Sequence, residues 1–344
     1  MAYTTINKST DHFNTVLYTG DGTTNRGITG VGFAPDFVWL KSRETAYNHQ
    51  LHDRVRGTSG GVLYSNLTNV QDSTYSLASF DSDGITVCKN TDNLGQNTNG
   101  DDNVFWSWKA GGTGSSNGNG SITSTVSANT TSGFSVVKWT GSGANATIGH
   151  GLGAAPSFII TKSLASTQEW CVGSSSLGWD KYFFLNETSA SASGSVYWQS
   201  TAPTSTVFSV GTAGPTNSSS GDLIAYCFVE KLGFSKFGKY IGNNQSDGTF
   251  VYTGFKPAWI LIKRDNAGYS WGINDSKRPA FNESNKYLIP DTSAIEQTNA
   301  VDLVSNGFKF RSTAGGFNAS ATYYFWAFAE APLVGSNNIA ATAR

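Results

Sequence analysis

Short apolar segments alternate with polar, glycine-rich turns along the whole chain, and one arrangement of them occurs three times. Each copy opens with an aromatic residue and a glycine, continues to a proline, and ends in an apolar run closed by a lysine. The copies span Tyr18 to Lys41, Trp139 to Lys162 and Tyr240 to Lys263. The first glycine and the proline are 15 residues apart in each copy, at Gly20 and Pro35, Gly141 and Pro156, and Gly242 and Pro257. A spacing kept three times indicates three related structural units.

These apolar segments predict β-strands. In the first unit we expect strands at Phe13 to Gly20, Ile28 to Phe33 and Phe37 to Lys41, with Pro35 interrupting the ladder between the last two. The segment from Phe37 is a continuous apolar run, which predicts a strand covered on both faces. Each unit closes with an aromatic strand, and these are Val104–Trp108, Leu223–Phe228 and Tyr324–Phe328. About eight strands per unit follow from this pattern.

Further positions recur at matching places in the three units. Fourteen residues beyond the proline stand His49, Trp170 and Trp271, and four residues later stand Asp53, Ser174 and Asp275. Four tryptophans in strand positions, Trp39, Trp106, Trp259 and Trp326, are interpreted as equivalent core residues. Glu230 and Glu330 end matching strands, which favours a structural role for both.

Composition sets the boundaries between the units. The segment GGTGSSNGNG carries no apolar residue and predicts a flexible linker. We therefore expect a first unit at 1–112, a linker at 113–120, a second unit at 121–232, a third unit at 233–335 and a polar tail at 336–344.

Charge and hydropathy exclude several classes of protein. Charged residues make up only 14% of the chain and the net charge is −1, so nothing predicts a nucleic-acid partner. No apolar run approaches the ~20 residues that cross a bilayer, and the first residues lack a secretory apolar segment. We expect a protein made in a cytoplasm, without membrane insertion.

The ionisable residues predict no catalytic centre. Cys88, Cys171 and Cys227 are interpreted as reduced core thiols, and the spacing of His49 and His52 is poor for a shared metal. Asp81 and Asp83 fit turn residues better than a calcium site, and Asp101 and Asp102 are interpreted in the same way. The sequence thus predicts no enzyme, no cofactor and no metal, while a cation at Asp81 and Asp83 stays open.

Two tryptophans without counterparts in the other units are the candidate ligand-binding residues. Trp179 and Trp198 stand among serine, glycine and other polar residues, where an exposed ring could stack on a sugar. The alternative is that each tryptophan anchors its own loop.

The chain resembles a β-rich domain family of unknown biochemical function that recurs in structural and tail-fibre-like proteins of tailed bacteriophages, especially marine ones. The residues that carry the resemblance include Phe13–Thr15 with Tyr18–Gly20, Ile28–Trp39, Phe80–Gly84, Trp106–Gly112, Phe250–Lys263, Trp271, Asp275 and Ser305–Phe308. The second unit departs from this pattern most, with Ser174 at the acidic position. With the strand spacing, the resemblance implies an all-β protein of three tandem β-sandwich, jelly-roll-like repeats.

The resemblance also implies a virion component displayed on the particle exterior, with other virion proteins as partners. One hypothesis is a tail-associated or fibre-like appendage that binds a host-surface glycan or protein. The alternative is a capsid decoration protein, in which three repeats imitate a trimer. Whether the chain forms a homo-oligomer is left open by the sequence.

Overall fold

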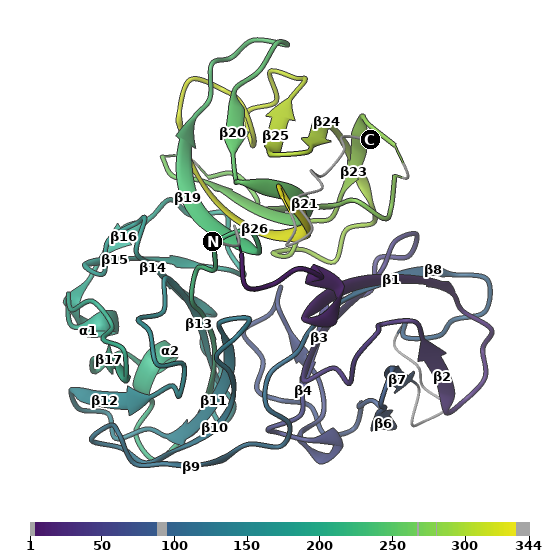
Figure 1. Ribbon diagram of the computed structural model, residues 1–344. Coiled ribbons are helices and arrows are strands. Elements are labelled where there is room, and N and C mark those ends of the chain that lie inside the picture. The colour runs from purple at the N-terminus through teal and green to yellow at the C-terminus, as the bar shows by residue number, and fades with distance from the viewer. Residues whose placement is uncertain (1–3, 88–94, 267, 280, 335–344) are drawn as a thin grey trace.

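The chain folds into three β-rich lobes arranged around a common centre (Figure 1). The computed structural model describes residues 4–87, 95–266, 268–279 and 281–334. All its sheets are antiparallel, and helix is limited to a few single turns. The all-β class expected from the sequence is confirmed. We call the three parts lobe 1 (residues 13–108), lobe 2 (residues 115–228) and lobe 3 (residues 235–332).

Lobe 1 holds a five-stranded and a three-stranded sheet. A 3₁₀ turn, Ser9–Asp11, precedes the lobe, and another, Thr58–Gly60, follows β4. The strands of lobe 1 are β1 (Phe13–Thr19), β2 (Arg26–Thr29), β3 (Phe37–Ser42), β4 (Gln50–Asp53), β5 (Leu63–Tyr64), β6 (Ser79–Phe80), β7 (Gly84–Val87) and β8 (Asp102–Trp108).

Lobe 2 holds an eight-stranded and a two-stranded sheet. Its two short helices are α1 (Ser195–Trp198) and α2 (Gly214–Asn217). Its strands are β9 (Ser115–Asn117), β10 (Ser124–Asn129), β11 (Phe134–Thr140), β12 (Ala146–Gly149), β13 (Phe158–Ser163), β14 (Cys171–Ser174), β15 (Lys181–Phe184), β16 (Ala192–Ser193), β17 (Val207–Val210) and β18 (Asp222–Phe228).

Lobe 3 holds two four-stranded sheets. Its strands are β19 (Ser235–Ile241), β20 (Phe250–Tyr252), β21 (Phe255–Arg264), β22 (Gly272–Asp275), β23 (Ser284–Tyr287), β24 (Gln297–Val304), β25 (Gly307–Phe310) and β26 (Thr322–Pro332).

The large sheets of the three lobes share one strand order. In each lobe the closing strand lies between the opening strand and the apolar strand of the repeated block. The orders are β1-β8-β3-β4 in lobe 1, β11-β18-β13-β14 in lobe 2 and β19-β26-β21-β22 in lobe 3. The registers match as well, since Phe37 pairs with Trp108, Phe158 with Phe228, and Trp259 with Phe328.

Each large sheet is covered on both faces, as the continuous apolar runs predict. In lobe 1, Val38, Leu40 and Phe105 face the small sheet, whereas the alternate residues Trp39 and Trp106 face the centre of the molecule. The alternation of side chains along a strand therefore supplies two apolar layers from one segment. The central layer includes buried residues from all three lobes.

The first glycine of each repeated block lies against a backbone carbonyl. A Cβ atom on Gly20, Gly141 or Gly242 would lie 2.0 to 2.2 Å from a carbonyl oxygen of the loop before the closing strand. A side chain at these positions would force the two loops apart. All three prolines are buried. Pro35 and Pro156 precede β3 and β13, whereas Pro257 lies within β21 at an irregularity of the ladder, where it interrupts no regular pairing.

A fully buried asparagine completes each of these loop contacts. The side-chain oxygens of Asn97, Asn217 and Asn318 each accept a hydrogen bond from the backbone N–H that follows the glycine. Their amide groups donate to the same turn, for example from Asn318 Nδ2 to the Gln245 carbonyl oxygen. These asparagines satisfy backbone groups that would otherwise be buried without partners.

Three expectations need correction. The segment expected to be a flexible linker at 113–120 contains β9, which pairs with β10 at the edge of the large sheet of lobe 2. The second strand is Arg26–Thr29, earlier than expected, because Gly30 and Gly32 adopt positive φ and end it. Trp259 is the counterpart of Phe37 rather than of Trp39, although all four tryptophans assigned to the core are buried.

Replacing Gly141 with alanine should destabilise the protein. The added Cβ would lie 2.2 Å from the Ser218 carbonyl oxygen, so we expect Gly141→Ala to lower the free energy of unfolding by about 1–3 kcal/mol. Chemical denaturation measures this change. The matched control is Gly118→Ala, where no atom lies within 4 Å of the added Cβ; equal stability of the two variants would contradict the steric role.

Candidate functional site: the interface between the three lobes

Three aromatic rings, one from each lobe, meet at the centre of the molecule. They are Trp108, Phe228 and Phe328, which hold equivalent positions in the closing strands β8, β18 and β26. The ring centroids lie 6.3 Å apart for Trp108 and Phe228, and 5.5 Å apart for each of the other two pairs. Each ring therefore contacts both others, in the edge-to-face or tilted geometry that aromatic pairs favour.

Around this centre, each lobe places one aromatic ring on the next lobe. Tyr226 of lobe 2 stacks on Phe37 of lobe 1, with centroids 4.1 Å apart. Trp326 of lobe 3 stacks on Phe158 of lobe 2 at 4.7 Å. The ring of contacts closes with Trp106 of lobe 1, which meets Trp259 of lobe 3 edge to face at 6.3 Å. The same positions are used three times, so the arrangement is a closed, head-to-tail ring.

A second set of contacts repeats in the same direction. The indole N–H of Trp170 in lobe 2 donates to the Tyr64 carbonyl oxygen in lobe 1 at 2.8 Å. That of Trp271 in lobe 3 donates to the Phe184 carbonyl oxygen in lobe 2 at 3.0 Å. In lobe 1 the equivalent residue is His49, which lies against the Ile289 backbone of lobe 3, and burial lowers its pKa well below the usual range.

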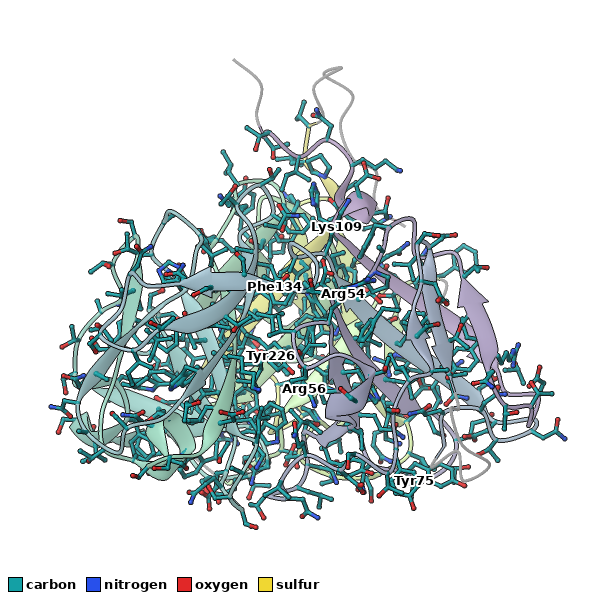
Figure 2. All side chains as sticks on the ribbon, turned by 90° about the horizontal axis from the view of Figure 1, so that it is seen from below. Arg54, Arg56, Tyr75, Lys109, Phe134 and Tyr226 are labelled. Atoms are coloured by element: carbon teal, nitrogen blue, oxygen red, sulfur yellow. The ribbon has the colours of Figure 1, made fainter. Side chains whose placement is uncertain are left out.

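In two of the three aromatic contacts, an aromatic residue also donates a hydrogen bond to a buried ion pair. In lobe 1, Asp53 accepts a hydrogen bond from Arg56 Nε at 2.5 Å and one from the Tyr226 hydroxyl of lobe 2 at 3.0 Å. Tyr226 and Arg56 lie close together in the interior (Figure 2). In lobe 3, Asp275 accepts a bond from Arg278 Nε at 2.6 Å.

The indole N–H of Trp106 in lobe 1 donates to the same Asp275 carboxylate across the lobe boundary, at 3.0 Å. Each aspartate therefore satisfies an arginine of its own lobe and an aromatic donor of the neighbouring lobe. Both the aspartate and the arginine of such a pair have to be present, because a buried charge without its partner is strongly destabilising.

Lobe 2 lacks this ion pair. Ser174 and Leu177 stand where lobe 1 has Asp53 and Arg56, and both are buried. The facing indole N–H of Trp326 has no hydrogen-bond acceptor among the residues that the structure describes. The third contact is therefore mainly apolar, and it depends on the stacking of Trp326 on Phe158.

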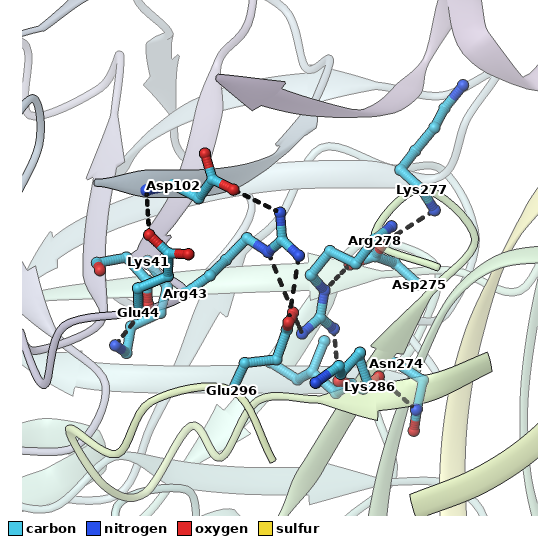
Figure 3. A network of polar contacts seen from close by, with 12 residues as sticks. Lys41, Arg43, Glu44, Asp102, Asn274, Asp275, Lys277, Arg278, Lys286 and Glu296 are labelled. Carbon is cyan, nitrogen blue, oxygen red and sulfur yellow. Dashed lines mark hydrogen bonds and ion pairs between the residues drawn. The ribbon is translucent and has the colours of Figure 1, made fainter. Parts of the chain in front are cut away.

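A network of charged side chains extends the contact between lobes 1 and 3 (Figure 3). Glu296 of lobe 3 binds Arg43 of lobe 1 at 3.2 Å and Arg278 of its own lobe at 3.1 Å. Arg43 also lies 3.6 Å from Asp102, which is partly exposed. One carboxylate thus links guanidinium groups from two lobes.

The lysines that close the repeated blocks are all buried. Lys162 of lobe 2 donates to the Thr68 carbonyl oxygen of lobe 1 at 2.7 Å, and Lys263 of lobe 3 donates to the Thr188 carbonyl oxygen of lobe 2 at 2.8 Å. Lys41 bonds carbonyl oxygens of its own lobe. Burial lowers the pKa of each of these lysines from its usual 10.5 to about 8.

The two tryptophans proposed as ligand contacts are buried. Trp198 is fully buried, Trp179 is 9% exposed, and their rings meet edge to face at 5.7 Å. Both pack against Gly173, where a Cβ would lie 2.7 Å from each ring. Neither ring presents a face to solvent for stacking on a sugar, which favours the alternative that each tryptophan anchors its own loop.

The other candidate residues have structural surroundings. The Asp83 carboxylate accepts backbone N–H bonds from Gly30 and Gly32, and the Asp81 carboxylate accepts hydroxyl bonds from Ser79 and Thr86. Cys171 and Cys227 are free, buried thiols, and Cys88 lies outside the described residues. In the described ranges, no helix is long and apolar enough to span a membrane.

The interface can hold lobes together, and its two aspartate–arginine pairs, Asp53 with Arg56 and Asp275 with Arg278, are closed to solvent. Sequence reasoning marked several of its positions as recurrent, among them Trp170, Trp271, Asp53 and Asp275, without locating their partners. The asparagines Asn97, Asn217 and Asn318 were missed, although each precedes its closing strand by a similar distance. That spacing was the one available signal.

The chain belongs to a family described as a domain of unknown function, DUF7483, whose model matches residues 8–332. The match covers all three lobes as one domain. The searches of curated proteins and of solved structures found no match.

Removing Asp53 alone should destabilise the protein far more than removing the whole ion pair. Asp53→Ser leaves the Arg56 charge buried without its partner, so we expect a loss of about 3–5 kcal/mol in the free energy of unfolding. The double variant Asp53→Ser, Arg56→Leu reproduces the residues of lobe 2 and should recover most of that loss. Urea denaturation of the three proteins measures it.

An exposed aspartate provides the control for this comparison. Asp247 is 80% exposed, and Asp247→Asn should leave the free energy of unfolding nearly unchanged. A double variant that is as unstable as Asp53→Ser would contradict the interpretation, because the loss would then come from the aspartate itself and not from the unpaired arginine.

The buried lysines predict a specific dependence on pH. Lys162 has a folded-state pKa of about 8, below its usual 10.5, so between these values the unfolded chain binds more protons and stability rises with pH. The Lys162→Met variant lacks this titration. We expect the free energy of unfolding of the parent, minus that of the variant, to increase from about pH 7.5 to about pH 10.

Denaturation curves at several pH values test the sign of this change. The matched control is Lys8→Met, whose side chain is 68% exposed and solvated in both states. The change measured for Lys162→Met is compared with that of this exposed control over the same range. A parent-to-Lys162→Met difference that falls with rising pH would show that burial does not depress this lysine.

Proposed function

We propose that this chain is a non-enzymatic structural protein of a bacteriophage particle, in which three jelly-roll-like β-sandwich repeats take the place of three subunits. The observation that carries the proposal is the closed ring of aromatic contacts, in which Tyr226, Trp326 and Trp106 each pack on the next lobe. The shared strand order and registers of the large sheets support descent from one repeated unit.

Such a ring supports the decoration hypothesis over the appendage hypothesis. A head-to-tail ring of three lobes whose large sheets share one strand order has approximate threefold symmetry, which suits a position of threefold symmetry on a capsid. Trp179 and Trp198, the candidate receptor contacts for the appendage hypothesis, are both buried. A tail-associated or fibre-like role with host-surface binding now rests on the family resemblance alone.

The proposal implies a location on the particle exterior and other virion proteins as partners. Immunogold electron microscopy of purified particles, with an antibody against this chain, tests it. We expect label spread evenly over the head. Label confined to the tail would contradict the decoration role and favour the appendage role, and intact particles without label would contradict an external virion component altogether.

A further inference from the structure

The outer edges of the three large sheets differ, although their centres are alike. The opening strand lies at the sheet edge in lobes 1 and 3, as β1 and β19. In lobe 2 the corresponding strand β11 is covered by β10, which in turn pairs with β9. The chain thus contains one copy of this edge with an added antiparallel strand and two copies without one.

In lobe 2 the covering segment bridges both sheets. Its strand β10 pairs with β11 such that Thr125 lies opposite Lys138, and the preceding Ile122 donates its backbone N–H to the Thr147 carbonyl oxygen of β12. Val126 of β10 joins the apolar core of the lobe. One extended segment therefore closes the gap between two neighbouring edges.

The equivalent surface of lobe 3 is open and apolar. Ile241 on β19 is 71% exposed, and Phe250 and Tyr252 on β20 are 45% and 54% exposed. A hydrogen bond from the Thr249 hydroxyl to the Ile241 carbonyl oxygen holds the two strands side by side. A hollow of about 470 Å³ lies at this edge, lined by Lys239, Tyr240, Ile241 and Thr322. We call this surface the β19–β20 edge.

Lobe 3 lacks a polar pair that the other two lobes have at this edge. In lobes 1 and 2 a threonine hydroxyl donates to an aspartate at the matching positions, Thr19 to Asp102 and Thr140 to Asp222, both at 2.7 Å. In lobe 3 the same pair of positions holds Ile241 and Thr322. The exposed isoleucine is therefore particular to lobe 3, whereas the matching edge of lobe 1 exposes Leu17 at the position of Lys239.

The substitution also leaves a positive charge without its partner. Lys138 of lobe 2 binds Asp222 at 2.8 Å, whereas no carboxylate among the described residues forms an ion pair with the equivalent Lys239. Lys239 is exposed on the edge strand. A segment lying on this edge would meet a lysine opposite the position that Thr125 holds in lobe 2.

We propose that the β19–β20 edge binds an extended segment of a partner protein, added antiparallel to β19 in the register that β10 takes on β11. The Phe237 N–H already donates to Glu230 and the Ile241 carbonyl oxygen already accepts from Thr249, so the backbone hydrogen bonds that provide affinity would form at Lys239 and at the Ile241 N–H. Specificity would come from two features of the bound segment: apolar side chains that pack on Ile241 and Phe250, and a carboxylate opposite Lys239. This proposal stands independently of the role on a phage particle.

A second copy of the chain is the disfavoured occupant. Pairing two β19 strands antiparallel would bring Lys236 and Lys239 of one copy near those of the other, and like charges on facing strands are destabilising. Lysines on edge strands commonly prevent such self-association. The same charges attract an acidic strand.

The probe is a labelled nine-residue peptide with the sequence of residues 121–129 carrying the change Thr125→Asp. We expect saturable binding to the full chain by fluorescence anisotropy, and slower amide hydrogen exchange in residues 239–241. Lys239→Ala and Ile241→Asp should each weaken binding at least about tenfold. Lys138→Ala, on the covered edge of lobe 2, should leave binding unchanged, and a peptide carrying Thr125→Lys should bind more weakly than the Asp form.

Three results would overturn the proposal. The first is the absence of saturable binding up to about millimolar peptide, and the second is binding that Ile241→Asp and Lys239→Ala leave unchanged. The third is a dimer of the chain alone, measured by light scattering and lost in Ile241→Asp, because it would assign the edge to a second copy. Circular dichroism and thermal unfolding of both variants should match the parent, since the altered side chains are exposed.

Discussion

The packing of aromatic rings where the three closing strands meet is the contact on which the rest of the structure depends. Trp108, Phe228 and Phe328 contact one another there, and every large sheet turns one complete apolar face toward them. A lobe separated from the others would expose that face, including rings as large as Trp106 or Trp326. Exposed apolar area of this extent is rare on soluble domains, so the lobes depend on one another for stability.

Because the lobes depend on one another, their relative position has to be defined, and buried polar groups at the boundaries between the lobes serve this purpose. Asp53 and Asp275 each serve an arginine from their own lobe and a donor from the next one. A buried pair of this kind adds little net stability, but it penalises any arrangement that separates its members. Lobe 2 shows that the fold does not require the pair, since Ser174 and Leu177 occupy the same positions. The two ion pairs therefore favour the correct apposition of lobes more than they add to the total stability.

Much of the architecture could be predicted from the sequence, because its signals are local. A glycine, a proline and a continuous apolar strand at fixed spacing gave the threefold recurrence, and the unbroken run from Phe37 correctly indicated a strand covered on both faces. Which neighbour covers the second face depends on contacts between residues far apart in the chain, such as Tyr226 with Asp53. The burial of Trp179 and Trp198 was left open by the sequence for a related reason. Their polar neighbours in sequence are turn residues, while Gly173 leaves space for both rings beneath.

The interior and the rim of the molecule have diverged in different ways. At the centre, the positions that stack keep aromatic rings, since Phe37 and Phe158 correspond to Trp259, and the replacements of the ion pair in lobe 2, Ser174 and Leu177, are buried as well. At the sheet edges the same positions change character, from the threonine and aspartate of lobes 1 and 2 to the isoleucine and threonine of lobe 3. Packing at the centre limits each residue through both neighbouring lobes, whereas an edge residue is limited by its own lobe only. Differences between the lobes that serve other molecules should therefore accumulate at the rim, where β9 and β10 already cover one of three equivalent edges.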